Sequence, residues 1–352
     1  MTRNGESVNI RAVCSLGLGS LLLLAPCQLA AQDIASRPSP ASEDAGWWAP
    51  SVTDSSRSSP VYRLLPEESL AREALLPASW READATQSEL PPSAFLERHR
   101  QLLSTLIPAT GVAVVVANSI IGYDTEHGFR IHHEGWFGRH TTNGGADKAS
   151  HMTDYFVITH LYEDVYKMMG YSENAAILWG FGLAVATGLA NEVTDGFTKH
   201  GFSWEDFAMD AAGATAASLV SVTHTKDLFG MRVSHLPSST YTHDVYSADF
   251  KFSGLGKRLD LNIGPLRWLL FSVTYGSKGY RVAPPIDEQR QLGFEIGLNL
   301  QQILTDVGVK RNTWWGYALH LVGDNVRFPF TAVGMRIDLN RGRWHGPNGG
   351  NE

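Results

Sequence analysis

Titratable side chains recur at one-turn spacing in three successive stretches of the sequence. The pairs are Lys148 and His151, Glu192 and Asp195, and Asp206 and Asp210. Residues three or four positions apart lie on one face of an α-helix, so each pair would present its polar groups together. The same faces continue into apolar and small residues, among them Phe181, Val185, Gly188, Gly213 and Ala217. This pattern indicates that the polar groups point inward.

Four carboxylates set against one lysine and one histidine would leave an excess of negative charge. Buried charges must be paired or must bind a cation. One outcome is a divalent cation, and its predicted ligands are His151, Glu192, Asp206 and Asp210. In a second outcome, one or two carboxylates keep their protons through raised pKa values, which would suit acid–base catalysis. In a third, backbone donors at a helix N-terminus balance the charge.

The catalytic candidates are therefore His151, Glu192, Asp195, Asp206 and Asp210, together with Lys148. They include no obvious nucleophile, because Ser203 is better explained as a helix cap three residues before Asp206. Gly144 and Gly145 lead into a helix without the Lys-Ser/Thr pattern of a phosphate loop, so nucleotide binding is not expected. No metal-ligand spacing on a convincing helix connects the other histidines, which include His132, His133, His140, His160 and His200.

The same residues would also suit a structural polar network that holds three helices in register. In that interpretation Asp147 is a helix N-cap and Lys148 pairs with Glu192. Ser203 and Asp206 then simply cap the following helix. The sequence leaves the structural, catalytic and metal-binding interpretations open.

Helical periodicity predicts the elements that would position these groups. One helix is expected over 147–169, ending at Gly170, a second over 172–197, and a third over 203–222. Short loops make successive helices antiparallel neighbours. The start of the first helix, the end of the second and the start of the third would then meet at one end of a bundle of about four helices.

Two stretches of this region carry no charge, 106–121 and 175–190. Each has 16 residues, fewer than the roughly 20 that a membrane-spanning helix needs. Small residues such as Ala184, Ala186 and Gly188 permit close helix contact, which is common in membrane bundles and also in tightly packed soluble cores. The bundle could be soluble or partly embedded in a membrane.

From about residue 240 to 341 the pattern changes to the alternation of β-strands. Leu292, Phe294, Ile296 and Leu298 alternate with small or polar residues, and turn residues at 276–279, 284–285 and 323–325 separate the alternating runs. Four to six antiparallel strands are expected. The alternation would suit the wall of an outer-membrane barrel, but such a barrel needs at least eight strands. The predicted fold class is α+β, with a helical bundle followed by an antiparallel β section.

The N-terminus has the features of a secretory signal over residues 1–31. Arg3 and Arg11 precede an apolar run, and small residues follow at Ala30 and Ala31. Cleavage there would remove both cysteines, Cys14 and Cys27, and leave no disulfide or thiolate site. Lipidation at Cys27 is one alternative, although proline fits poorly before that cysteine, and an uncut N-terminal anchor is another. Residues 32–104 are expected to form a flexible linker with short helical patches, and residues 342–352 a polar tail.

The net charge is −7, so the chain has no basic footprint for nucleic acid. An exported chain of this composition would find its partners among membrane or envelope components. The oligomeric state does not follow from the sequence.

Residues 105–225 resemble the YfiM-like family of predicted periplasmic proteins and lipoproteins, and more distantly the VanZ-like membrane proteins. The resemblance rests on the segment Glu134 to Gly138, the segment Gly144 to His151, the pair Glu192 and Asp195, and the set Gly201, Ser203, Asp206, Asp210 and Gly213. The segments 274–280 and 293–300 resemble the β extension of longer members. Met152 departs from the family, which would place an aromatic residue there. The resemblance implies an envelope location and a helical bundle, and it implies no activity.

We therefore expect a protein of the periplasm or outer membrane of a Gram-negative-type bacterium, with a structural or binding role centred on the acidic cluster. The alternative is a metal-assisted or acid–base hydrolase or transferase that acts on envelope lipid or glycan. That enzyme would use His151 and one carboxylate as base and acid.

Overall fold

The structure is a computed structural model that describes residues 90–91, 93–122, 128–234, 245–280, 287–328 and 330–345. The expected signal peptide, the lipidation residue Cys27, most of the expected linker and the last seven residues of the tail lie outside the described residues. The described chain contains several helices followed by an antiparallel sheet of six strands, so the predicted α+β class is confirmed.

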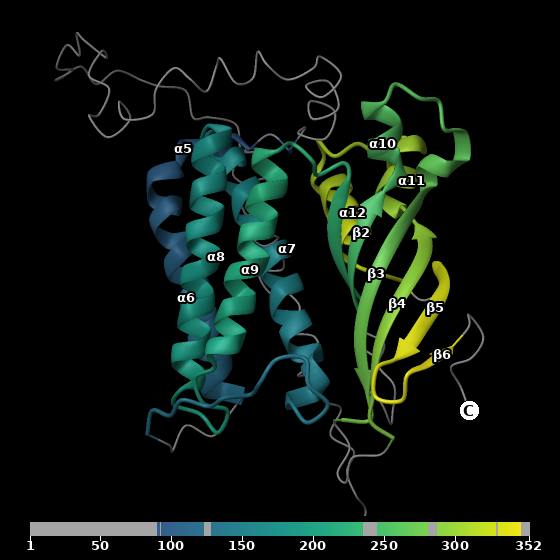
Figure 1. Ribbon diagram of the computed structural model, residues 1–352. Helices are drawn as coiled ribbons and strands as arrows, with labels where there is room; N and C mark the ends of the chain where they lie inside the picture. Colours follow the sequence, from purple (N-terminus) through teal and green to yellow (C-terminus); the bar gives the residue numbers. More distant parts are fainter. Residues whose placement is uncertain are drawn as a thin grey trace, which may run out of the picture.

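Four long helices stand side by side on the left of Figure 1, with a short helix α5 (Ala94–Arg98) before them. They are α6 (Arg100–Gly122), α7 (Ala146–Met168), α8 (Glu173–Asp195) and α9 (Trp204–Val222). The helices α7, α8 and α9 contact one another, and α6 packs against α8. These three successive helices correspond to the three helices predicted to carry the titratable pairs.

Local sequence explains where the helices begin and end. The side chain of Ser203 accepts a hydrogen bond from the amide of Asp206 (3.2 Å), so the predicted cap of α9 is present. Gly170 follows α7 with a φ of 78°, a left-handed conformation that favours glycine. The N-cap of α7 is Gly145, at a φ of 82°, and Asp147 lies in the first turn. The interpretation of Asp147 as the N-cap is therefore wrong, because the backbone has already entered the helix at Ala146.

Small residues let the three helices approach closely at the positions that matter for the polar cluster. A methyl group on Gly213 of α9 would collide with the backbone of Met152 on α7. A methyl group on Gly188 of α8 would lie 2.7 Å from the carboxylate of Asp210 on α9. The apolar core of the helices lies toward their other end, around Tyr166 and Met169.

The six strands form one antiparallel sheet in chain order from β1 to β6. They are β1 (Phe229–Ser234), β2 (Val245–Lys251), β3 (Leu269–Lys278), β4 (Gln289–Leu298), β5 (Ala332–Asp338) and β6 (Arg343–His345). The sheet begins at Phe229 and ends at His345, so it extends past both expected limits, 240 and 341.

Short helices interrupt the β section, and the sequence did not predict them. They are α10 (Phe252–Arg258), the 3₁₀ helix η3 (Gly264–Trp268), α11 (Leu300–Asp306) and α12 (Trp314–Asn325). The turn expected at 323–325 lies in the last turn of α12 instead. The caps explain this difference, because Asn299 and Thr313 accept hydrogen bonds from the first turns of α11 and α12. The described residues contain eight α-helices rather than about four.

The helices meet the sheet where α7 begins. Ala146 packs with Val233 of β1 and Tyr246 of β2. The hydroxyl of Tyr275 on β3 donates a hydrogen bond to the carbonyl of Gly144 (2.5 Å). The start of α7 is therefore fixed against the sheet.

Within the described residues, α8 is the one helix that is long and apolar enough to cross a membrane. Core helices of soluble proteins have the same length and composition, and 44% of the apolar window of α8 is buried.

Candidate functional site

The acidic cluster lies at the end of the helical layer where α7 starts, α8 ends and α9 starts. It contains Lys148 and His151 from α7, Glu192 from α8, and Asp206 and Asp210 from α9. Among these residues only His151 is not fully buried. Asp195, the sixth predicted member, is half-buried on α8 and accepts a hydrogen bond from Asn191 of the same helix (3.5 Å). We treat Asp195 as a flanking residue.

Lys148 is the cationic centre of the cluster, with a side chain that is 1% exposed. Its Nζ lies 2.5 Å from Asp206 Oδ1, 2.7 Å from Glu134 Oε2 and 3.1 Å from Asp147 Oδ2. Burial disfavours the ammonium, but these carboxylates outweigh burial and raise the pKa of Lys148 above its ordinary value. The expected pairing of Lys148 with Glu192 is not the observed arrangement, because Glu134 and Asp147 join Asp206 around the ammonium.

Glu134 and Asp147 are the members that sequence reasoning missed. Glu134 lies in the loop before α7, which is pinned to the start of α9 by hydrogen bonds in both directions, from His132 N to Phe202 O and from Phe202 N to Arg130 O. A loop carboxylate has no helical periodicity to reveal its direction. The one available signal was the family resemblance, which includes the segment Glu134 to Gly138.

His151 links the two aspartates of α9. Its Nδ1 lies 2.7 Å from Asp210 Oδ1, and its Nε2 lies 3.8 Å from Asp206 Oδ1. Burial favours neutral imidazole, but the charges of Asp210, Asp206 and Asp147 outweigh it and raise the pKa of His151 well above its ordinary value. The side chain of His151 remains 20% exposed, so the buried carboxylates connect to the surface through this ring.

Glu192 and Glu134 are the carboxyl groups that keep protons most readily. Burial raises the pKa of Glu192 to about 8, although a hydrogen bond from the amide of Ser203 (3.0 Å) favours the ionised form. Burial and the charges of Asp206 and Asp147 raise the pKa of Glu134 to about 7, against the stabilising contact with Lys148. Protonation of these two groups relieves part of the excess charge near neutral pH.

Asp210 is fully buried, and its two oxygens differ in their surroundings. Oδ1 faces His151, whereas Oδ2 has no hydrogen-bond partner among the described residues. Burial raises the pKa of this carboxyl despite the positive charge of His151. Buried polar atoms in native proteins are almost always satisfied, so a buried carboxylate oxygen without a protein partner beside a histidine is a candidate contact for a bound ion or water.

Two triads of residues could hold a metal ion, because the potential ligand atoms within each triad all lie within 4.8 Å of one another. One consists of His151, Glu192 and Asp210, and the other of Asp147, His151 and Asp206. Imidazole nitrogen with two carboxylate oxygens is a donor set that zinc and manganese accept. The predicted ligands His151, Glu192 and Asp210 thus fall in one triad, whereas Asp206 falls in the other.

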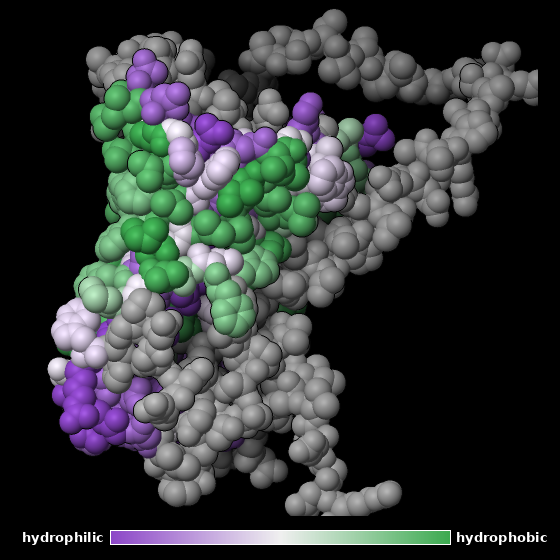
Figure 2. Space-filling view, turned by 90° about the vertical axis from the view of Figure 1, so that its right-hand side faces the viewer, coloured by the Kyte–Doolittle hydropathy of each residue, from purple (hydrophilic) through white to green (hydrophobic). Residues whose placement is uncertain are grey.

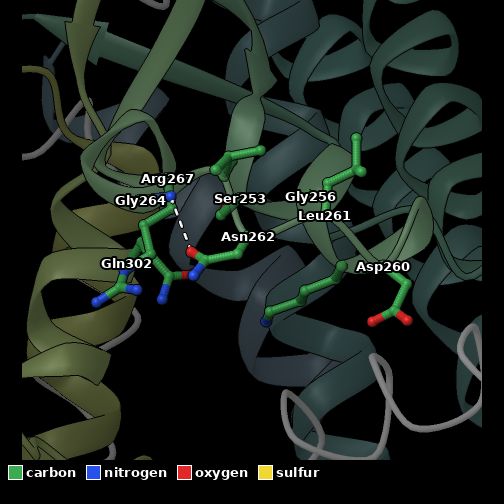
Figure 3. A pocket seen from close by; sticks show the side chains of 10 residues that line it. Ser253, Gly256, Asp260, Leu261, Asn262, Gly264, Arg267 and Gln302 are labelled. Atoms are coloured by element: carbon green, nitrogen blue, oxygen red, sulfur yellow. Dashed lines mark hydrogen bonds between the residues drawn. The ribbon is translucent and has the colours of Figure 1, made fainter.

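A polar hollow of about 320 Å³ lies away from this cluster, beside α10, η3 and α11 (Figure 3). Ser253, Asn262, Arg267 and Gln302 line it, and the amide of Gly264 donates to Asn262 Oδ1 across its wall (3.1 Å). No sequence pattern predicted this hollow.

The acidic cluster and the three helices that carry it lie within a segment that matches a known family. Residues 133–222 match a family described as predicted periplasmic lipoprotein (DUF2279), a domain of unknown function. The matched segment contains the five helical residues of the cluster together with Glu134 and Asp147, and it ends with α9. No curated protein and no solved structure matches the chain significantly. The similarity to predicted periplasmic lipoproteins supports an exported, envelope location.

Proposed function

We propose that this envelope protein binds a divalent cation at His151, Glu192 and Asp210, and that the cation ties α7, α8 and α9 together. The observation that carries the proposal is the buried Oδ2 of Asp210, which has no hydrogen-bond partner among the described residues and belongs to a triad of potential ligands. A cation would satisfy this oxygen and would balance the excess of carboxylates over Lys148 and His151.

The triad with Asp206 is the weaker candidate for the cation. It shares His151, but Lys148 Nζ lies 2.5 Å from Asp206 Oδ1 and already neutralises that group. A divalent ion at Asp206 would have to displace or approach the ammonium, which Coulomb repulsion opposes. The proposed ligand set of one nitrogen and two oxygens favours zinc or manganese over calcium, which prefers oxygen ligands alone.

Cation binding at this triad would release protons. The cation requires a neutral His151 and ionised Glu192 and Asp210, whereas their raised pKa values favour the protonated forms. The affinity should therefore increase as the pH rises toward about 8, the pKa of Glu192.

Metal analysis and titration of the purified chain test the proposal. We expect manganese or zinc to raise the melting temperature of the chelator-treated protein, and Asp210→Asn to abolish that shift. Glu163→Gln is the matched control, because Glu163 is also buried on α7 but pairs with Lys167 and Lys226 outside the cluster. It should lower stability and keep the cation response. An equal response in wild type and Asp210→Asn would contradict the proposal.

The hydrogen bond of 2.7 Å between His151 and Asp210 favours a second candidate, acid–base hydrolysis or transfer on envelope lipid or glycan. A carboxylate that orients a partly exposed imidazole is a common arrangement for a general base. Turnover of a glycan or lipid substrate that persists in chelator and is lost in His151→Gln would favour this candidate over simple cation binding.

A further inference from the structure

The sheet has one polar face and one apolar face, and its polar face is the buried one. On that face Arg232 Nε lies 2.6 Å from Asp249 Oδ2, and the hydroxyl of Ser272 donates to Asp249 Oδ1 (2.6 Å). All three side chains are buried. In a soluble antiparallel sheet the apolar face normally packs on the core and the polar face meets water. The polarity of this sheet is the reverse.

The polar face is also the concave face. Glu295 on β4 accepts hydrogen bonds from Arg336 on β5 (3.0 Å) and from Arg327. Arg327 follows α12 and lies beside β1, because its amide donates to the carbonyl of Val233 (2.8 Å). Residues next to β1 and on β4 and β5 can share one ion-pair network only if the sheet curls around it. The apolar face is therefore convex.

Cross-strand register aligns the side chains of the convex face in apolar rows. One row consists of Phe229, Phe250, Phe271, Ile296 and Val333, and the next of Met231, Ala248, Val273, Phe294 and Met335. Val333 is 64% exposed and Met335 is 53% exposed. Figure 2 shows hydrophobic residues covering much of the described surface on this side, with hydrophilic residues above and below.

The helices cover only one end of this face. The start of α7 packs on Val233 and Tyr246, and Phe137 contacts the ring of Tyr275. In the two apolar rows beyond that contact, most side chains are exposed in the described part of the chain, and Met231, Phe250 and Phe271 are half-buried. Contiguous exposed apolar surface on this scale marks an interaction site.

We propose that the convex apolar face of β3, β4 and β5 rests in the hydrocarbon of a lipid membrane. Two identical convex faces would touch along a narrow line and bury little area, whereas a fluid lipid layer conforms to a curved surface. The rows are spaced by about 7 Å along the strands, so the apolar band is shorter than a hydrocarbon core of roughly 30 Å. The face enters one leaflet and does not span the membrane.

The rim of the band has the side chains expected at a headgroup layer. Trp268, which is exposed, precedes β3, and Lys257 and Arg267 line the polar hollow beside it (Figure 3). Leu261, which is exposed, lines this hollow, and the exposed Leu259 and Leu266 each lie next in sequence to a lining residue. Tryptophan and basic side chains with apolar neighbours concentrate at membrane interfaces. The hollow offers donors to a lipid phosphate, and its Asp260 offers an acceptor to an amine headgroup.

Flotation with vesicles of phosphatidylethanolamine and phosphatidylglycerol tests the proposal. All proteins would carry Cys27→Ser, so that no acyl chain at this residue contributes to binding. We expect the parent protein, which carries Cys27→Ser and an unchanged sheet, to float with the vesicles. Met335→Asp should reduce the partition coefficient onto the vesicles by roughly tenfold or more, as loss of one buried apolar side chain predicts. The milder pair Val333→Thr and Met335→Gln should reduce it in the same direction if the aspartate variant folds poorly.

Leu178→Asp is the matched control, because Leu178 is 69% exposed on α8, in the helical layer. It should leave vesicle binding unchanged. The proposal is overturned if the Cys27→Ser parent does not float, or if Leu178→Asp abolishes binding while Met335→Asp does not. It is also overturned if Met335→Asp changes only the oligomeric state measured by light scattering, because the face would then be a contact between copies of the chain. The cation proposal is untouched by any of these outcomes.

Discussion

Lys148 and Asp210 represent two ways in which a buried charge is handled in the same cluster. Lys148 has three carboxylates within 3.1 Å, so its ammonium is stabilised after complete loss of solvent. One carboxylate oxygen of Asp210 is hydrogen-bonded to His151, and the other has no hydrogen-bond partner among the described residues. The first arrangement is what a structural network requires, and the second is what a ligand site provides. We propose that the structural interpretation applies to Lys148 and the binding interpretation to Asp210.

The pH dependence of stability should report the proton held by Glu192. Its pKa is raised from 4.5 to about 8 in the folded protein, so the folded state binds more protons than the unfolded state between these values. Its contribution to stability is therefore largest at low pH and is lost as the pH rises through that window. In Glu192→Gln, which cannot ionise, the free energy of unfolding in chelator should fall less steeply from about pH 5 to about pH 8.

Urea unfolding at several pH values measures that slope. The raised pKa of His151 acts in the same direction as Glu192, so part of the slope should persist in the variant. Identical slopes in wild type and Glu192→Gln would show that Glu192 is ionised throughout the range.

At the scale of the elements, close contact between α7 and α9 decides where the cluster can form. Gly213 faces the backbone of Met152, so the two helices touch without intervening side chains. One turn earlier on α9, Asp210 is thereby brought within hydrogen-bonding distance of His151. A larger residue at Gly213 would separate α7 from α9, the helices that supply His151 and Asp210.

Gly213→Ala should destabilise the protein by about 1–3 kcal/mol, as overpacking in a tight interface does. Gly182→Ala is the matched control, because Gly182 lies in α8 with nothing within 4 Å of an added Cβ. It should be neutral or stabilising by up to about 1 kcal/mol, the difference in helix propensity. Thermal denaturation of both variants distinguishes the outcomes, and equal stability of the two would rule out the close contact at Gly213.

At the scale of the whole molecule, the protein combines a helical layer that buries polar groups with a sheet that exposes apolar ones. Both features fit a protein of the envelope, where a lipid surface is available to cover apolar side chains. The family match over residues 133–222 supports that location independently of the sheet.

Mass spectrometry of the mature protein tests the route to the envelope. We expect the mature chain to begin at Gln32, after the small residues Ala30 and Ala31. A mature chain that begins at an acylated Cys27 would contradict this prediction and would add a lipid anchor to the apolar face of the sheet. Membrane attachment would then have two sources, which increases its strength.

The sequence by itself determined much of the helical half of the site. Spacings of three and four placed Lys148 with His151 and Asp206 with Asp210 on helix faces, and short loops predicted that these faces meet. This works because helix geometry is local and periodic. Glu134 could not be placed in the same way, because a loop carboxylate is positioned by contacts distant in sequence, such as that between Ile131 and Phe202.

In the β section the sequence determined the alternation but not its direction. The alternation of Phe294 and Ile296 with Glu295 assigns these residues to opposite faces of the sheet. The same alternating sequence would result whichever of the two faces is buried. Only the tertiary structure decided that Glu295 turns inward, toward Arg327 and Arg336, and that the apolar side chains turn outward. The physical reason is that burial depends on curvature and on the partners that distant segments supply, and neither is encoded in the local period of a strand.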